Sequence, residues 1–218
     1  FQPEDQRFFF GRQREIHEVL TDLQALISQG RARFLIVAGG SGTGKSSLVL
    51  AGAVPKLLAA DPALRFMRMR PGSDPHAALR DALASWQPGT AGLLLVDQLE
   101  EIFTQTDSPA QRESFVARLW ELASEPEGLR ILLTLRVDFI PRCGELFVDA
   151  QGLRLDRVAY DERHRIFVSL PEPAQLRAAI VEPARQVGLG LQAGLADRIL
   201  AEVGREPGAL PLLQDALT

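Results

Sequence analysis

The residues of this chain that are best suited to chemistry lie in one short stretch, from Gly39 to Ser47, with the sequence GGSGTGKSS. This stretch fits the phosphate-binding pattern G-x-x-x-x-G-K-[ST] from Gly39 to Ser46. Glycines let the backbone turn tightly, so that successive N–H groups reach phosphate oxygens that a Cβ atom would obstruct. The spacing therefore predicts a loop that binds the phosphates of a nucleoside triphosphate.

Each part of the loop has a predicted role. Lys45 is expected to reach the β- and γ-phosphates as a point charge, while the Ser46 hydroxyl coordinates Mg²⁺. The helix that follows would direct its positive N-terminal end at the anion. The residues expected to surround the phosphates are Gly40, Ser41, Gly42, Thr43, Gly44, Lys45, Ser46 and Ser47.

The flanking sequence has to support the pattern, because the pattern itself fixes only four residues. Phe34 to Ala38 is a short apolar run that predicts a buried strand, and Ser47 to Leu58 predicts a helix. Strand, loop and helix thus occur in the order that a phosphate loop requires. This order disfavours the alternative, a Gly/Ser turn without a ligand.

A second stretch, Gly92 to Asp97 (GLLLVD), is an apolar run that ends in a carboxylate. Such a run is typical of a strand buried on both faces. In a phosphate-loop fold the neighbouring strand delivers an aspartate to the Mg²⁺ shell, so Asp97 is predicted to join Ser46 at the metal. Glu100 and Glu101 follow within one turn, and we expect one of them to orient or deprotonate the attacking water. The alternative for both glutamates is a solvated helix start.

Leu129 to Arg136 (LRILLTLR) predicts another buried strand, with Arg136 at its C-terminal end. Ligands gather at that edge of open α/β sheets, so Arg136 is predicted to sense the γ-phosphate and to stabilise its charge. A plain salt bridge, for example to Asp138, is the competing interpretation.

The remaining periodicity predicts the elements that position these residues in an α/β fold. Apolar residues at helical spacing indicate a helix from Gln13 to Ser28. Arg65 to Arg70 alternates, which predicts a strand whose arginines mark an exposed sheet edge. Further helices are expected from Asp74 to Trp86 and after the capping-box sequence that starts at Ser108.

The C-terminal part of the chain has a different character. Asp149 to Arg165 is polar and predicts a loop, and a short strand is expected from Arg165 to Leu170. From Pro171 onward only helices are predicted, the first of them interrupted near Pro183. We therefore expect a nucleotide-binding domain over residues 1–170 and a helical lid domain over residues 171–218. The pattern is still helical at Thr218, which suggests a piece of a longer protein.

Composition excludes several classes of function. The 218 residues are 46% hydrophobic and 24% charged, as in ordinary globular proteins, and no apolar run approaches the roughly 18 residues of a membrane helix. No signal-peptide layout begins the sequence, so a soluble cytoplasmic protein is expected. The single cysteine, Cys143, and three scattered histidines argue against disulfides and zinc. A net charge of −4 argues against a nucleic-acid surface.

Several separated stretches together are similar to the nucleotide-binding module of STAND ATPases (signal-transduction ATPases with numerous domains), especially the bacterial novel STAND group. They are FFGR at Phe9–Arg12 with Glu15, the loop Gly39–Ser47, DQLEEIF at Asp97–Phe103, LTLRVDF at Leu133–Phe139, and GALPLL at Gly208–Leu213, which is similar to the family's G-x-P motif. The resemblance implies a P-loop NTPase fold of the ASCE or AAA+-like type, a three-layer sandwich with a parallel sheet followed by a helical lid.

The resemblance also implies roles that spacing alone does not show. Phe10, Gly11 and Arg12 would wrap the adenine, Arg136 would be the sensor arginine, and Pro211 would contact the nucleotide from the lid. It further implies a switch, in which ADP holds the lid closed and exchange for ATP permits self-oligomerisation and activation of an effector. Effector and sensor domains would then lie outside this chain.

The sequence departs from the wider AAA+ pattern at Gln98, where many relatives have the catalytic glutamate. Hydrolysis is therefore expected to be slow. The winged-helix domain that usually follows the lid is absent from these residues. The leading hypothesis is a regulatory ATPase that binds ATP or ADP with Mg²⁺.

Two alternatives stay open: a DNA-acting AAA+ initiator or loader, and a binding-only module that retains ADP. A GTPase is the least favoured class, because a guanine-reading N-K-x-D motif needs a lysine. Neither Lys45 nor Lys56, the two lysines of the chain, lies in such a motif.

Overall fold

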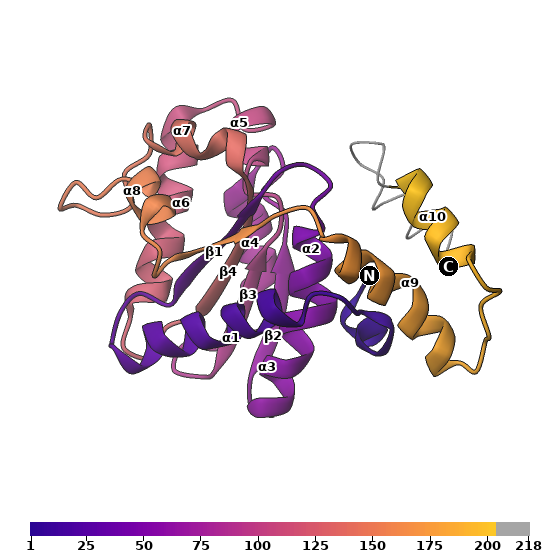
Figure 1. Ribbon diagram of the computed structural model, residues 1–218. Coiled ribbons are helices and arrows are strands. Elements are labelled where there is room, and N and C mark those ends of the chain that lie inside the picture. Colours follow the sequence, from indigo (N-terminus) through magenta and orange to yellow (C-terminus); the bar gives the residue numbers. More distant parts are fainter. Residues whose placement is uncertain (204–218) are drawn as a thin grey trace.

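A five-stranded parallel sheet forms the centre of the computed structural model, which describes residues 1–203 (Figure 1). The strands are β1 (Phe34–Gly39), β2 (Arg65–Met69), β3 (Gly92–Val96), β4 (Arg130–Arg136) and β5 (Arg165–Val168). Their spatial order is β2-β3-β4-β1-β5, and each neighbouring pair is parallel. Because all strands run the same way, their C-terminal ends meet at one edge of the sheet.

The register brings the predicted functional segments together at that edge. Gly39, the last residue of β1, lies opposite Arg136, the last residue of β4. On the other side of β4, Val96 of β3 lies opposite Leu133, so Asp97 emerges beside the end of β4. The phosphate loop after β1 and the carboxylate after β3 thus flank β4.

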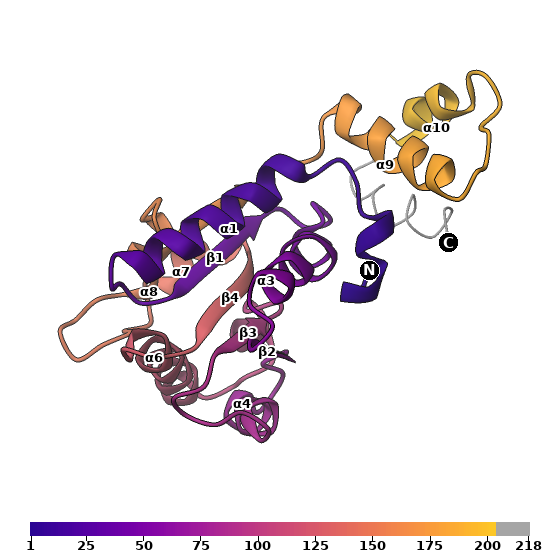
Figure 2. The ribbon, with the colours of Figure 1, turned by 90° about the horizontal axis from the view of Figure 1, so that it is seen from below.

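Helices cover both faces of the sheet and link its strands. They are η1 (Pro3–Phe8), α1 (Gln13–Ser28), α2 (Lys45–Ser47), η2 (Leu48–Ala53), α3 (Val54–Ala60), α4 (Pro75–Leu83), α5 (Glu101–Thr104), α6 (Pro109–Ser124), η3 (Val137–Phe139), α7 (Ile140–Cys143), α8 (Leu155–Tyr160), α9 (Pro173–Gln186) and α10 (Leu195–Val203). Figure 2 shows α1 and α6 on opposite sides of the sheet. Among the described residues no helix has the length and apolar character needed to cross a membrane.

Two apolar cores form between the sheet and these layers. One includes Phe115 and Leu119 of α6, and the other includes Val19 and Leu23 of α1. The strands β1 and β3 are buried along their whole length because both faces are covered. The predicted α/β fold with a parallel sheet is therefore confirmed.

The helix after the phosphate loop runs without a break through α2, η2 and α3, and its middle part, η2, is a π-helix. These wider turns lie just before Pro55, whose ring has no N–H to donate to a preceding carbonyl. Gly52 in η2 lies against α1, where an added Cβ would come within 2.7 Å of the Ile16 side chain. The small residue lets the two helices approach closely.

Most predicted elements agree with the structure, including the helix from Gln13 to Ser28. The predicted loop from Asp149 to Arg165 is wrong in part, because α8 lies within it. Its residues Leu155, Val158 and Ala159 are buried at helical spacing. The predicted interruption near Pro183 is also wrong, because α9 continues through this residue to Gln186.

The helices after β5 pack on each other. Ile180 of α9 and Ala196 of α10 form a small core of their own, separate from the two cores of the sheet. In Figure 1 α9 lies beside η1 near the N-terminus. The predicted contact residue Pro211 and its motif, residues 208–213, lie outside the described part of the chain.

Candidate functional site

A cavity of about 870 Å³ opens at the C-terminal edge of the sheet. One end is polar and is lined by the phosphate loop together with Gln98, Glu100 and Arg136. The other end is largely apolar, and its lining includes Phe8, Phe9, Phe10, Leu176, Ile180 and Pro183. The N-terminal segment (residues 1–12) and α9 therefore enclose the side of the cavity that lies away from the phosphate loop.

The conformation of the phosphate loop follows from its glycines. Gly42 and Gly44 have φ angles of +71° and +85°, a region that other residues rarely adopt. At Gly39 the limit is space, because an added Cβ would lie 2.5 Å from the carbonyl oxygen of Val168 at the end of β5. The Thr43 hydroxyl donates to the carbonyl of Gly40 at 3.1 Å, which closes the turn.

The side chain of Lys45 is buried against the phosphate loop. Its Nζ donates to the carbonyls of Gly39 at 3.0 Å and Gly40 at 2.7 Å. Burial lowers the pKa of Lys45, and the nearby carboxylate of Glu100 opposes this shift. The ammonium group therefore has weak neutral acceptors, which a phosphate oxygen can replace with a charged one.

Asp97 is fully buried, and hydrogen bonds reach both of its carboxylate oxygens. Oδ1 accepts from the Ser46 hydroxyl at 2.6 Å and from the Thr134 hydroxyl at 2.9 Å, while Oδ2 accepts from Arg68 Nη2 at 2.7 Å. Burial alone would raise the pKa of Asp97, but these three donors outweigh it and hold the pKa below its ordinary value. The carboxylate is therefore ionised at neutral pH.

Ser46 and Asp97 together fit a magnesium site. Ser46 donates its only hydroxyl hydrogen to Asp97, so its oxygen lone pairs stay free for a cation. Both groups are hard oxygen ligands, which Mg²⁺ prefers, and Mg²⁺ in such sites takes its other ligands from phosphates and water. The described residues contain no cluster of three or more His, Cys, Asp or Glu side chains that could hold a metal ion.

The two candidate glutamates have different surroundings. Glu100 lines the cavity, and its Oε2 accepts from the backbone N–H of Arg136 at 3.3 Å. Burial raises the pKa of Glu100 despite this bond and the nearby charge of Lys45. Glu101 instead accepts from the backbone N–H of Gly72 at 3.1 Å. Of the two glutamates, Glu100 is the one that lines the cavity.

Gln98 has a strained backbone beside these residues. Its φ is +61°, the only positive value at a non-glycine residue in the part of the chain that is described. Its N–H donates to Thr134 Oγ1 at 2.7 Å, which holds the strained turn in place. Such strain commonly occurs at functional sites, where the surrounding structure enforces it.

Arg136 lines the cavity and also forms the salt bridge that sequence analysis considered. Its Nη2 lies 2.7 Å from Asp138 Oδ2, and both side chains are exposed, Arg136 by 41% and Asp138 by 51%. Exposed pairs of this kind contribute little to stability, because water screens the two charges. A phosphate can therefore draw Arg136 away from Asp138 at small cost, so the two interpretations of this arginine are compatible.

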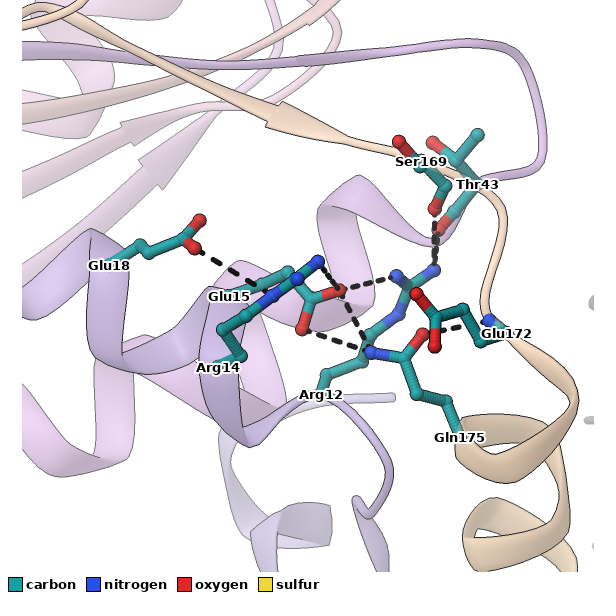
Figure 3. Close-up of polar contacts among 8 residues, drawn as sticks. All are labelled: Arg12, Arg14, Glu15, Glu18, Thr43, Ser169, Glu172 and Gln175. Atoms are coloured by element: carbon teal, nitrogen blue, oxygen red, sulfur yellow. Dashed lines mark hydrogen bonds and ion pairs between the residues drawn. The ribbon is translucent and has the colours of Figure 1, made fainter.

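Arg12 belongs to a buried network that ties the N-terminal segment to three other elements (Figure 3). Its Nη2 donates to the carbonyls of Thr43 in the phosphate loop and Ser169 after β5, both at 2.9 Å. Its Nη1 donates to Glu15, also at 2.9 Å, and Glu15 accepts from Gln175 of α9 at 3.1 Å. Phe10, Gly11 and Arg12 all line the cavity, and the Arg12 guanidinium binds protein acceptors there.

Three residues of this site were not predicted from the sequence. Thr134 is the one hydroxyl inside the apolar run of β4, a signal that could have located it. Arg68 was interpreted as a sheet-edge residue; β2 is indeed an edge strand, but the side chain reaches Asp97 on the next strand. Gln175, which links α9 to Glu15, has no signal in the local sequence.

The whole chain, residues 1–218, matches the model of the family Novel STAND NTPase 1. The chain belongs to this family. It is therefore a P-loop NTPase module of the STAND type, as the motifs around Gly39–Ser47 and Asp97 predicted, and nucleotide binding is a property of the family. No curated protein matches the chain significantly.

Solved structures of other P-loop ATPases share the fold of this STAND module. Domain III of the Thermotoga maritima replication initiation protein DnaA is 15% identical, with a TM-score of 0.60 and 98% of both chains covered. A Walker-type ATPase of Pyrococcus abyssi is 12% identical, with a TM-score of 0.59, 99% of this chain and 70% of that chain covered. The Thermotoga maritima RuvB Holliday junction branch migration motor is 16% identical, with a TM-score of 0.54 over 93% of this chain and 60% of that chain.

Proposed function

We propose that this STAND module is a regulatory switch that binds ATP and ADP with Mg²⁺ and hydrolyses ATP slowly. The strongest support is the convergence of Lys45, Ser46 and Asp97 at one edge of the sheet, beside a cavity with a polar and an apolar end. The phosphates would bind at the loop, where backbone N–H groups and Lys45 supply positive charge. The base would then lie between the N-terminal segment and α9.

Adenine is the base that fits this arrangement. The apolar end of the cavity includes the rings of Phe8, Phe9 and Phe10 and the aliphatic side chains of α9. Such a lining holds a purine by stacking and burial, with backbone groups to read its edge. A guanine-reading N-K-x-D motif is missing from the sequence, since neither lysine lies in one.

Hydrolysis would depend on Glu100. The raised pKa of its carboxyl group makes it a stronger base than a solvent-exposed glutamate, and it lies at the polar end of the cavity near Lys45. Bound Mg²⁺ would neutralise charge on the β- and γ-phosphates. Gln98, at the position of the glutamate of many relatives, cannot accept a proton from water, which supports a slow reaction.

The lid formed by residues 171–218 would report which nucleotide is bound. Its helix α9 lines the cavity and is tied to the phosphate loop through Gln175, Glu15 and Arg12. A nucleotide can shift the lid only by its different affinity for two lid positions, and a γ-phosphate held by Arg136 and Lys45 would supply that difference. The ATP-bound form would then oligomerise and act on effector and sensor domains outside this chain.

The test is nucleotide binding by a Lys45→Ala variant, with Lys56→Ala as the matched control. These are the two lysines of the chain, so both variants lose the same charge. Lys56 is exposed on α3 and does not line the cavity. We expect fluorescent N-methylanthraniloyl-ADP to bind to the wild type and to Lys56→Ala but at least about tenfold more weakly to Lys45→Ala. Equal affinity for all three proteins would contradict the site.

Two further measurements separate the alternatives. Bound ADP with no phosphate release from ATP would indicate the binding-only module. Binding to duplex DNA at low salt would favour a DNA-acting ATPase, although the net charge of −4 argues against it.

A further inference from the structure

Arg68 makes a contact with Asp97 that the proposed function does not use. Its Nη2 lies 2.7 Å from Asp97 Oδ2, and Arg70, which follows directly after β2, approaches the same oxygen at 3.6 Å. The other oxygen, Oδ1, already accepts from the hydroxyls of Ser46 and Thr134. Arg68 and Arg70 therefore occupy the carboxylate oxygen that the hydroxyl groups leave free.

This contact supplies charge where the candidate metal would supply it. Asp97 is fully buried and pairs with a guanidinium group, and a buried carboxylate without a counter-charge is costly. Without a metal, the guanidinium group of Arg68 neutralises it. With Mg²⁺ present, the metal and its water shell need space and negative charge beside the same carboxylate. The Arg68 guanidinium, 2.7 Å from Oδ2, takes up this space and neutralises this negative charge.

We propose that Arg68 is an internal counterion that competes with Mg²⁺ for Asp97, so that metal loading requires Arg68 to move away. The side chain can do so because it is 30% exposed and lies on an edge strand. Its Nη1 also donates to the side chain of Gln2 at 3.3 Å, so the N-terminal segment helps to hold it at Asp97. This inference rests on the proposed nucleotide site and adds control of its metal.

The experiment compares Arg68→Met with Arg65→Met. Arg65 lies on the same strand, and its side chain donates to Ser85 and not to Asp97. Its replacement by methionine removes the same positive charge as Arg68→Met but leaves the surroundings of Asp97 unchanged. The affinity of N-methylanthraniloyl-ADP is measured while the Mg²⁺ concentration is raised from a metal-free buffer. We expect the half-saturating Mg²⁺ concentration to fall about tenfold in Arg68→Met, because the competing cation is gone, and to change less than about twofold in Arg65→Met.

A second variant guards against a folding defect, since Arg68→Met leaves Asp97 with only the longer contact from Arg70 at 3.6 Å. Arg68→Lys keeps the charge but loses the planar fork, so we expect it to fold like the wild type and to shift the Mg²⁺ requirement by a smaller factor. In thermal unfolding with saturating ADP, the rise in Tm on adding Mg²⁺ should be larger for Arg68→Met than for the wild type.

The outcomes distinguish this inference from the proposed function. An unchanged or higher Mg²⁺ requirement in Arg68→Met would overturn the competition and would place Arg68 among the groups that support the metal-loaded site. If the wild type and Arg65→Met bind no nucleotide at any Mg²⁺ concentration, the proposed function itself fails and this inference fails with it.

Discussion

Replacement of Glu15 by Gln tests whether the buried network joins the N-terminal segment, the phosphate loop and α9. Glu15 is 3% exposed and accepts hydrogen bonds from Arg12 and from Gln175. A bond to a charged group contributes about 1.5 to 3 kcal/mol and a neutral one about 0.5 to 1.5 kcal/mol. Loss of the charge therefore removes about 1 kcal/mol from the bond with Gln175, and it leaves the buried Arg12 guanidinium without its counter-charge.

The geometry adds to this cost. The Oε1 of Gln175 accepts from the backbone N–H of Glu172 at 2.8 Å, so its Nε2 must face position 15. A glutamine there would place its own NH₂ group against Arg12 or against Gln175, and neither can accept. We expect Glu15→Gln to lower the free energy of unfolding by about 2 kcal/mol, which corresponds to a fall in Tm of roughly 4 to 8 °C.

Urea denaturation followed by circular dichroism measures this loss, with Glu18→Gln as the matched control. Glu18 lies on the same helix, is 44% exposed and has Arg14 as its partner at 3.8 Å, so its replacement should change stability by less than about 0.5 kcal/mol. A loss of less than 0.5 kcal/mol in Glu15→Gln would refute the network as a structural tie.

The pH dependence provides an independent check with a defined sign. Burial would raise the pKa of Glu15, but hydrogen bonds from its surroundings outweigh burial and lower the pKa from its ordinary 4.5. The carboxylate therefore contributes stability above pH 4.5 that is lost as the pH falls through the lower pKa of the folded state. The difference between wild type and Glu15→Gln should shrink below pH 4.5, and a constant difference would contradict the assignment.

Two other variants test the lid and the catalytic base. Gly11→Ala would place a Cβ 2.3 Å from the carbonyl oxygen of Gln175, at a residue whose φ is +85°, so α9 must move. We therefore expect the affinity for ADP, measured by fluorescence titration, to fall at least about tenfold. Unchanged affinity would mean that α9 does not enclose the nucleotide. Glu100→Gln should reduce phosphate release from ATP at least about 100-fold with nucleotide affinity retained, whereas Glu101→Gln should leave the rate within about threefold. The reverse order would assign the base to Glu101.

The elements that were predicted correctly are those whose structure local interactions determine. Apolar runs such as Gly92 to Val96 form buried strands because covering both faces of a sheet requires continuous hydrophobicity. The N-cap at Ser108 and the helix from Gln13 to Ser28 likewise follow from short-range hydrogen bonds and periodicity. The buried helix from Leu155 to Tyr160 was missed because it is only six residues long and lies in a polar context.

The sequence by itself determined the phosphate loop, the aspartate that ends β3 and the parallel α/β fold, because glycine conformation, strand hydrophobicity and motif spacing act over a few residues. Only the tertiary structure decided which polar groups from distant parts of the chain pair. Strand order places β2 beside β3, which brings Arg68 to Asp97, and the packing of α9 brings Gln175 to Glu15, 160 residues away in the chain. Such pairings depend on how distant elements pack, and no local pattern encodes that arrangement.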